Sequence, residues 1–440
     1  MFKTLRNALK VKDIRNRLIY TAIALLVVRL GTLLPTPAIS REVTNGWFNP
    51  DTLGFFNSLT GGSFTKMSIF ALSITPYISA SIIVQLLTIA IPKLEEMQKE
   101  GEDGRKKITA ITRYITVALA LIESTAMAIG FGASGALEGG LTFTNVIVIV
   151  ASFTAGSAFL MWLGERITQN GVGNGISIIL MANIISTMPG DFIMLFQKYI
   201  QAKPVVNAII AALVIIAIVV VTVVLVLILQ NAQRNIPVQY AKKVQGRKMV
   251  GGQTSHIPLK VNTAGVIPVI FANSLMSFPI VIASFFGVQP ARAYFWPKIL
   301  KVLNQNSWLV TKTWGDFKYS IGIILYVVLV IFFAYFYTSI TFNPIEVANN
   351  MKKQGGFIPG IRPGKPTTEY LTKVLNNIIF IGAIGLTIVC VIPIFFSGVF
   401  GADMSFGGTS IIIIVGVIIE TIKQIEAQLL VRHYKGFLND

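Results

Sequence analysis

The chain has 440 residues, of which 53% are hydrophobic and only 13% are charged, and its mean hydropathy is +0.69. A soluble domain carries roughly 25% charged residues, so this composition excludes an ordinary soluble protein and indicates a membrane protein. The net charge of +18 must therefore lie in loops, and the single cysteine, Cys390, excludes a disulfide framework within one chain.

Ten apolar segments follow one another along the chain. A helix needs about 20 apolar residues to cross the hydrocarbon core of a bilayer. The clearest segment, 205–229, contains no charged residue, whereas in the tenth the strongly apolar part ends before Glu420 and Lys423. The predicted spans are 18–34, 68–91, 111–131, 143–163, 176–196, 205–229, 264–287, 319–342, 374–397 and 409–430.

The distribution of basic residues predicts the orientation. Ten spans place both termini on the same side, and most of the 37 Lys and Arg residues lie in segments on that side. Since Lys and Arg collect in cytoplasmic loops, both termini are predicted to be cytoplasmic.

Three loops on the cytoplasmic side are polar and basic, namely 92–110, 230–263 and 343–373. The first is explained at least as well by its effect on topology as by binding. The other two are longer than orientation requires, and their Gly-Gly pairs and prolines predict ordered, hairpin-like excursions. A basic loop without acidic residues suits RNA phosphates or an acidic protein surface, with anionic lipid headgroups as the alternative.

Two spans carry unusual polar residues. Span two includes Ser79 and Gln85, and span seven includes Pro268, Asn273 and Pro279. Such residues either join helices or mark a helix that bends or borders water. Glu123 in span three has the same two interpretations, because an acid at membrane depth is either paired with a neighbouring helix or functional.

Several motifs resemble the SecY family of protein-conducting channels, and the resemblance runs from the basic N-terminus to Asp440. They are TPYISASIIVQLL at 75–87, KEGEDGRKKI at 99–108, TQNGVGNGISIIL at 168–180, IPVQYAKK, GRKM and GGQTSHIPLKVN across 236–262, GFIPGIRPGKPT at 356–367, and FGGTSIII at 406–413.

The resemblance implies an all-α polytopic membrane protein, with ten transmembrane helices in two inverted five-helix halves that form a clamshell. The halves would be 1–190 and 205–440, joined by an external hinge loop at 191–204. An hourglass channel would lie between them, with a narrow waist and a plug at 53–66.

The resemblance also implies roles for individual residues. A ring of aliphatic side chains at the waist would exclude water without binding a passing peptide, and it maps to Ile74, Ile78, Ile176, Leu180, Ile270 and Ile413. The plug maps to Phe55, Phe56, Asn57, Leu59, Gly61 and Gly62. A lateral gate, through which apolar segments leave into lipid, maps to Ser79, Gln85, Glu123, Asn273, Ser274 and Phe278.

Partners follow from the same resemblance. The ribosome and the ATPase SecA would dock on Arg247, Lys248, Arg362 and Lys365, and SecE, with SecG, would complete the complex in the membrane. The substrates would be signal sequences and unfolded polypeptides, and the location would be the bacterial cytoplasmic membrane. No cofactor or metal is expected.

Two other classes of protein remain as alternatives. A secondary transporter also uses inverted repeats and broken helices, but it needs a charged midplane site, for which only Glu123 qualifies. A membrane-embedded enzyme needs a catalytic constellation, and the two histidines, His256 and His433, have no metal-binding spacing. The run 360–367 also lacks the spacing of a phosphate-binding loop, so the chain is not expected to be an enzyme.

Overall fold

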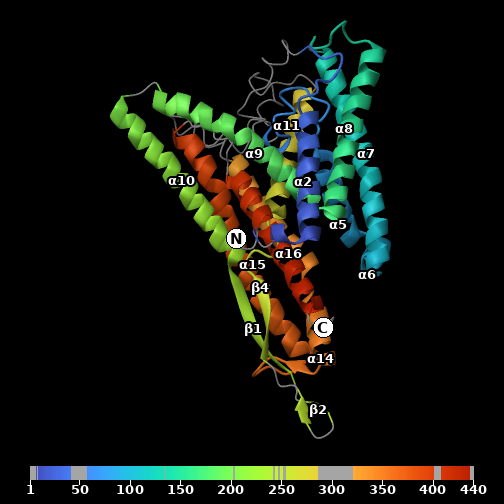
Figure 1. Cartoon of the computed structure of the whole chain (residues 1–440), viewed down its shortest axis with the longest axis vertical. Coiled ribbons are helices and arrows are strands. Elements are labelled where there is room, and N and C mark those ends of the chain that lie inside the picture. The colour runs from blue at the N-terminus through green and yellow to red at the C-terminus, as the bar shows by residue number, and fades with distance from the viewer. Residues whose placement is uncertain are drawn as a thin grey trace.

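A computed structural model describes the chain at residues 6, 8–40, 57–133, 135–201, 204–240, 243–245, 248–250, 254–285, 321–400 and 408–436. Five long helices belong to the first part of the chain: α2 (Lys12–Gly31), α5 (Thr75–Ala90), α7 (Glu102–Ala133), α8 (Phe143–Asn170) and α9 (Gly175–Phe196). Five more follow: α10 (Val205–Asn231), α11 (Ile267–Phe285), α13 (Ile321–Thr341), α15 (Lys365–Phe400) and α16 (Gly408–Gly436) (Figure 1). Each of the ten corresponds to one predicted span.

Length and apolar composition identify the membrane-crossing helices. Among the described residues six helices qualify, and a seventh does if α5 and the short α6 (Pro92–Lys99), bent by 106°, count as one span. The helix α2 carries Arg15, Arg17 and Arg29, and α16 carries Glu420, Lys423 and Glu426, so their apolar stretches are interrupted. In α11 only Ile267–Met276 is counted, as a shorter apolar helix.

Two predicted segments have a different conformation in the structure. Span two was predicted from residue 68, but α5 begins at Thr75, because Ser73 has a φ of +51° and Pro76 favours a helix start. The external loop predicted at 191–204 is helical for most of its length. Helix α9 runs to Phe196 in spite of Pro189, and a π-helical turn, η1 (Gln197–Gln201), continues it.

The basic loops form a small sheet with its own core. Strands β1 (Gln233–Tyr240) and β4 (Thr254–Lys260) pair antiparallel, and β5 (Gly356–Phe357) adds to the other edge of β1. A further hairpin joins β2 (Lys243–Gln245) to β3 (Lys248–Val250). The strands lie at the lower end of Figure 1 together with α14 (Pro344–Lys353).

The sheet, α14 and the start of α15 share one cluster of buried side chains: Ile236, Val238, Leu259, Ala348, Met351, Ile358, Leu371, Val374 and Ile378. The described parts of the two long basic loops that form β1, β4, β5 and α14 therefore share one core, and β1 with β4 is a hairpin-like pair as predicted.

A second small cluster joins distant parts of the chain. The loop between α8 and α9 buries Val172 against Ala8 and Ile14 near the N-terminus and against Ile425 of α16. Two hydrogen bonds fix this loop on α2: Arg17 Nη1 donates to the Gly171 carbonyl at 3.3 Å, and the Val172 N–H donates to Thr21 Oγ1 at 3.2 Å. We call this arrangement the Val172 clasp.

The two halves of the chain meet along two lines. Helix α11 contacts α5 and α7, and α16 contacts α9. Contacts within each half also include α7 with α8 and α11 with α13. The junction between the halves is therefore a distinct place in the fold, and the apolar cluster described next lies on it.

Candidate functional site

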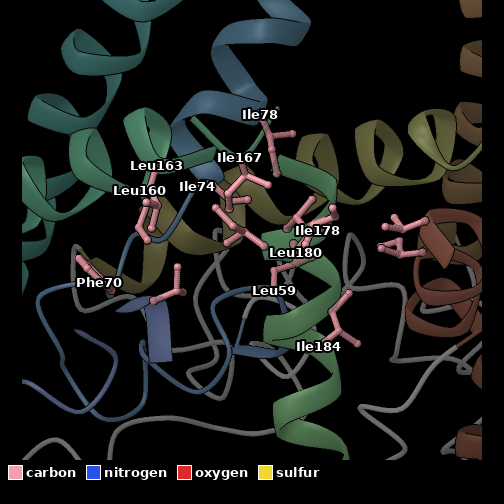
Figure 2. Packing of buried hydrophobic residues seen from close by; sticks show 14 of the residues in the cluster. Leu59, Phe70, Ile74, Ile78, Leu160, Leu163, Ile167, Ile178, Leu180 and Ile184 are labelled. Carbon is pink, nitrogen blue, oxygen red and sulfur yellow. The ribbon is translucent and has the colours of Figure 1, made fainter. Parts of the chain in front are cut away.

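An apolar cluster at the junction contains all six residues predicted for the pore ring. We call it the waist cluster. Ile74, Ile78, Leu180, Ile270 and Ile413 are buried in it, and Ile176 packs against it while partly buried. Figure 2 shows Ile74 and Ile78 on one side of Leu180. The structure thus brings the six together, and their role as a channel constriction stays a prediction.

Helix starts position several of these side chains. Ile74 is the residue before the first turn of α5, and its carbonyl accepts the Ile78 N–H at 3.1 Å, so both lie along one face. Asn174 caps α9 by accepting from the Ile176 N–H at 3.1 Å, which fixes the rotation of the helix that carries Leu180.

The close approach of α9 to α8 also positions side chains of the waist cluster. A Cβ on Gly175 would lie 1.9 Å from the Gly164 carbonyl oxygen, so glycine is required where α9 crosses α8. The crossing brings Leu160, Leu163 and Ile167 of α8 into the waist cluster. Ile176 points toward the same place, since its Cδ1 would lie 2.5 Å from a Cβ on Gly164.

Sequence reasoning missed part of the waist cluster. Ile184 and Val417 belong to it, four residues after Leu180 and Ile413. This i, i+4 spacing was the signal that could have found them. The contributions of α2 and α8 had no comparable signal, because they depend on long-range helix contacts.

The predicted plug segment is partly described. Phe55 and Phe56 lie outside the described residues. Residues 57–59 are helical, the chain from Thr60 to Ile74 is made mostly of turns, and Gly61 and Gly62 both have positive φ, +67° and +79°. Leu59 is 3% exposed and lies in the waist cluster beside Leu180 (Figure 2).

The predicted lateral-gate residues are distributed over the facing helices α5, α7 and α11. Ser79, Gln85, Glu123 and Ser274 are half-buried, and the Phe278 side chain lies outside the described residues. Asn273 is fully buried, and its Nδ2 donates to Tyr326 Oη on α13 at 3.4 Å. This bond joins two helices of the second half, so Asn273 does not bridge the seam to α5.

The docking residues are only partly described. Arg247 lies outside the described residues, and Lys248 begins β3. Arg362 and Lys365 are exposed, at the turn before α15 and at its first residue. Thr367 Oγ1 donates to the Arg362 carbonyl at 2.8 Å, and Ile358, four residues earlier, is anchored in the sheet core. Arg362 is thus presented on a rigid frame.

The buried side chains of the waist cluster are hydrocarbon. Branched alkyl side chains offer water no hydrogen bonds, so a ring of them prevents the passage of ions by excluding water. Within the part of the chain that the structure describes, no group of three or more His, Cys, Asp or Glu side chains is placed to hold a metal ion.

Comparison with known proteins gives a consistent result. The SecY family pattern matches residues 68–422. Two relatives similar to this chain are protein translocase subunits SecY, from Halalkalibacterium halodurans at 44% identity over 448 residues and from Bacillus subtilis at 42% over 457 residues. Each alignment covers 100% of both chains.

Solved structures with a similar fold are more distant in sequence. One is described as the structure of a protein conducting channel, with a TM-score of 0.65 and 18% identity. Another is Sec61 in the canine ribosome-channel complex from the endoplasmic reticulum, with a TM-score of 0.62 and 17% identity. Both matches cover 94% of this chain and 92% of the other, so they support the ten-helix fold.

Proposed function

This chain belongs to the SecY family of protein translocase subunits, so it acts as a protein-conducting channel, and we propose that polypeptides pass through the waist cluster. The observation that carries this path is the position of the cluster at the junction, with Ile78 and Leu180 from one half and Ile270 and Ile413 from the other. Separation of the halves would open a route lined by alkyl groups, which favour no particular peptide sequence.

Crosslinking tests the path. A photoreactive residue in place of Ile78, Ile270 or Ile413 is expected to form adducts with a polypeptide arrested during transport. Ile209 and Ile216 on α10, 56% and 60% exposed, serve as matched controls because they project from the outside of the molecule. Equal adduct yields from α10 and from the waist would contradict the proposed path.

A side exit would lie between α5 and α7 on one side and α11 on the other. Half-buried polar side chains, such as Ser79, Gln85 and Glu123, lie on the helices of this seam. A sufficiently apolar segment would leave through it into lipid, driven by about 25 cal/mol per Å² of buried apolar surface.

Energy and substrate would come from the cytoplasmic side. The ribosome and the ATPase SecA would dock at Arg247, Lys248, Arg362 and Lys365. The buried core shared by the three-stranded sheet, α14 and the start of α15 supports docking at the exposed Arg362 and Lys365. SecE and SecG would complete the complex within the bacterial cytoplasmic membrane, with both termini in the cytoplasm. The canine neighbour is a ribosome-channel complex, in keeping with this proposal.

Charge reversal tests docking. Arg362→Glu is expected to weaken SecA-driven transport and ribosome affinity about tenfold, because the guanidinium sits on a frame that loses little entropy on binding. Lys93→Glu on α6 is the control, since it makes the same charge change in the first basic loop. Unchanged transport and affinity in Arg362→Glu would remove this residue from the docking surface.

The alternative of a secondary transporter is not favoured. The family match and the full-length relatives are protein translocase subunits. The one charged residue that sequence analysis offered for a midplane site, Glu123, is half-buried on α7, a helix in contact with α5 and α11 at the seam.

A further inference from the structure

Asn183 is a buried amide on α9, within the apolar run 178–185. Its side chain is 1% exposed, and its Nδ2 group makes two hydrogen bonds. It donates to the Leu59 carbonyl at 3.0 Å and to Ser73 Oγ at 3.2 Å. A buried amide in an apolar helix is costly unless it is bonded, so these contacts are a specific feature of the fold.

The two partners lie at opposite ends of one segment. The Leu59 side chain lies in the waist cluster. Ser73 lies two residues before Thr75, the first residue of α5. Ser73 has a φ of +51°, a left-handed conformation that side chains disfavour. The hydrogen bond from Asn183 holds Ser73 in that conformation. One amide therefore fixes the segment both at Leu59 and at Ser73.

A third contact involves Gly61. A Cβ at this position would lie 2.7 Å from Arg29 Nη1 and 3.0 Å from Asn183 Oδ1. The backbone of the segment therefore passes between α2 and α9 with no room for a side chain. Arg29 Nη1 and Asn183 Oδ1 are buried and have no hydrogen-bond partner among the described residues. They flank Gly61 as a donor and an acceptor.

We propose that Asn183 is a latch that holds the segment 57–74 in the waist, and so sets how readily the channel opens. This inference rests on the proposed function and on the further proposal that the segment, predicted from sequence as a plug, seals the path. Opening requires Leu59 to leave the waist cluster, and Leu59 cannot leave without breaking its carbonyl bond to Asn183. Asn183 is thus a positioning residue for gating, distinct from the alkyl ring that excludes water.

Substitution of the amide tests the latch. Asn183→Leu keeps a similar volume but removes both hydrogen bonds, and it is expected to raise ion leak through idle channels in liposomes about tenfold. Ser73→Ala removes one of the two bonds and keeps the bond to the Leu59 carbonyl, so about a threefold increase is expected. The second variant keeps the test open if Asn183→Leu folds poorly.

A control on the same helix separates gating from general loosening. Ser186 Oγ donates to the Asn183 carbonyl at 2.6 Å, a bond that lies within α9 and does not touch the segment. Ser186→Ala should therefore leak like the wild type. Equal leak in Ser186→Ala and Asn183→Leu would overturn the latch.

Deletion of residues 57–63 distinguishes the latch from the proposed seal. If the deletion channel leaks and Asn183→Leu adds no further leak in that background, the amide acts through the segment, as proposed. Additional leak in the deletion background would show that Asn183 only packs α9 and would overturn the latch alone. A deletion channel that stays tight would overturn the proposed seal, and the latch with it. Wild-type leak in both Asn183→Leu and Ser73→Ala would also overturn the latch.

Discussion

Replacing Ile78 and Ile413 together with Ser is expected to make the idle channel leak ions and small solutes at least about tenfold more than the wild type, because hydroxyl groups allow water into the constriction. The two residues come from α5 and α16, on opposite sides of the junction, and are 8% and 1% exposed. The measurement is solute release from liposomes that contain channels without a substrate.

The control for this pair must lose the same packing elsewhere. Ile149 and Ile412 are also isoleucines from the two halves, both 0% exposed, but they belong to other clusters than the waist. Each truncated isoleucine costs about 2–5 kcal/mol of stability in either pair, so thermal melting should fall similarly in both. Since Ile412 precedes Ile413 on α16, the control pair changes the same helix at the neighbouring position. A waist pair that leaks no more than the control pair would mean that these side chains only pack the fold.

Deleting residues 57–63 is expected to give longer and more frequent openings in single-channel recordings, with transport largely retained. The deletion removes Leu59 from the waist cluster, and none of the deleted chain lies in the ten long helices. It spares Phe64, which is 1% exposed and packs in the core of the first half, where its loss would cost about 3–5 kcal/mol.

A flexible linker in place of residues 57–63 distinguishes two roles of the segment: sealing by its side chains and simple connection of the chain. Exchanging residues 57–63 for a Gly/Ser linker of equal length removes the Leu59 side chain but keeps the chain connection, so it should open as the deletion does. A deletion channel that fails to insert, when the linker channel inserts and stays tight, would mean that the segment is a structural spacer.

The helices were largely predictable from sequence, because a long apolar run in a membrane protein has few alternatives. The segment 205–229 predicted α10 closely, and Asn174 before Gly175 is a recognisable helix cap. The ends were less predictable. Hydropathy extended span two back to residue 68, whereas the backbone at Ser73 delays the helix to Thr75.

The candidate site was harder than the helices to predict from sequence patterns. The spacing of Ile74 and Ile78 predicts a shared face but not the helix that it meets, and the six ring residues were chosen by resemblance. Asn183 had a visible signal, a lone amide in an apolar run, which sequence analysis did not use. Its partners, Leu59 and Ser73, are more than 100 residues away (separations of 124 and 110), so no local pattern connects them.

The Val172 clasp has a consequence for the order of biosynthesis. Val172 contacts Ile14, which is made before it, and Ile425, which is made near the end of the chain. At about 5–20 residues per second, synthesis of the intervening chain takes on the order of tens of seconds. During that interval the loop after α8 can rest on α2 but has no α16 to pack against. The last helix is therefore the one that completes the clasp, and a chain truncated before α16 lacks Ile425, so Val172 then packs only against the N-terminal segment.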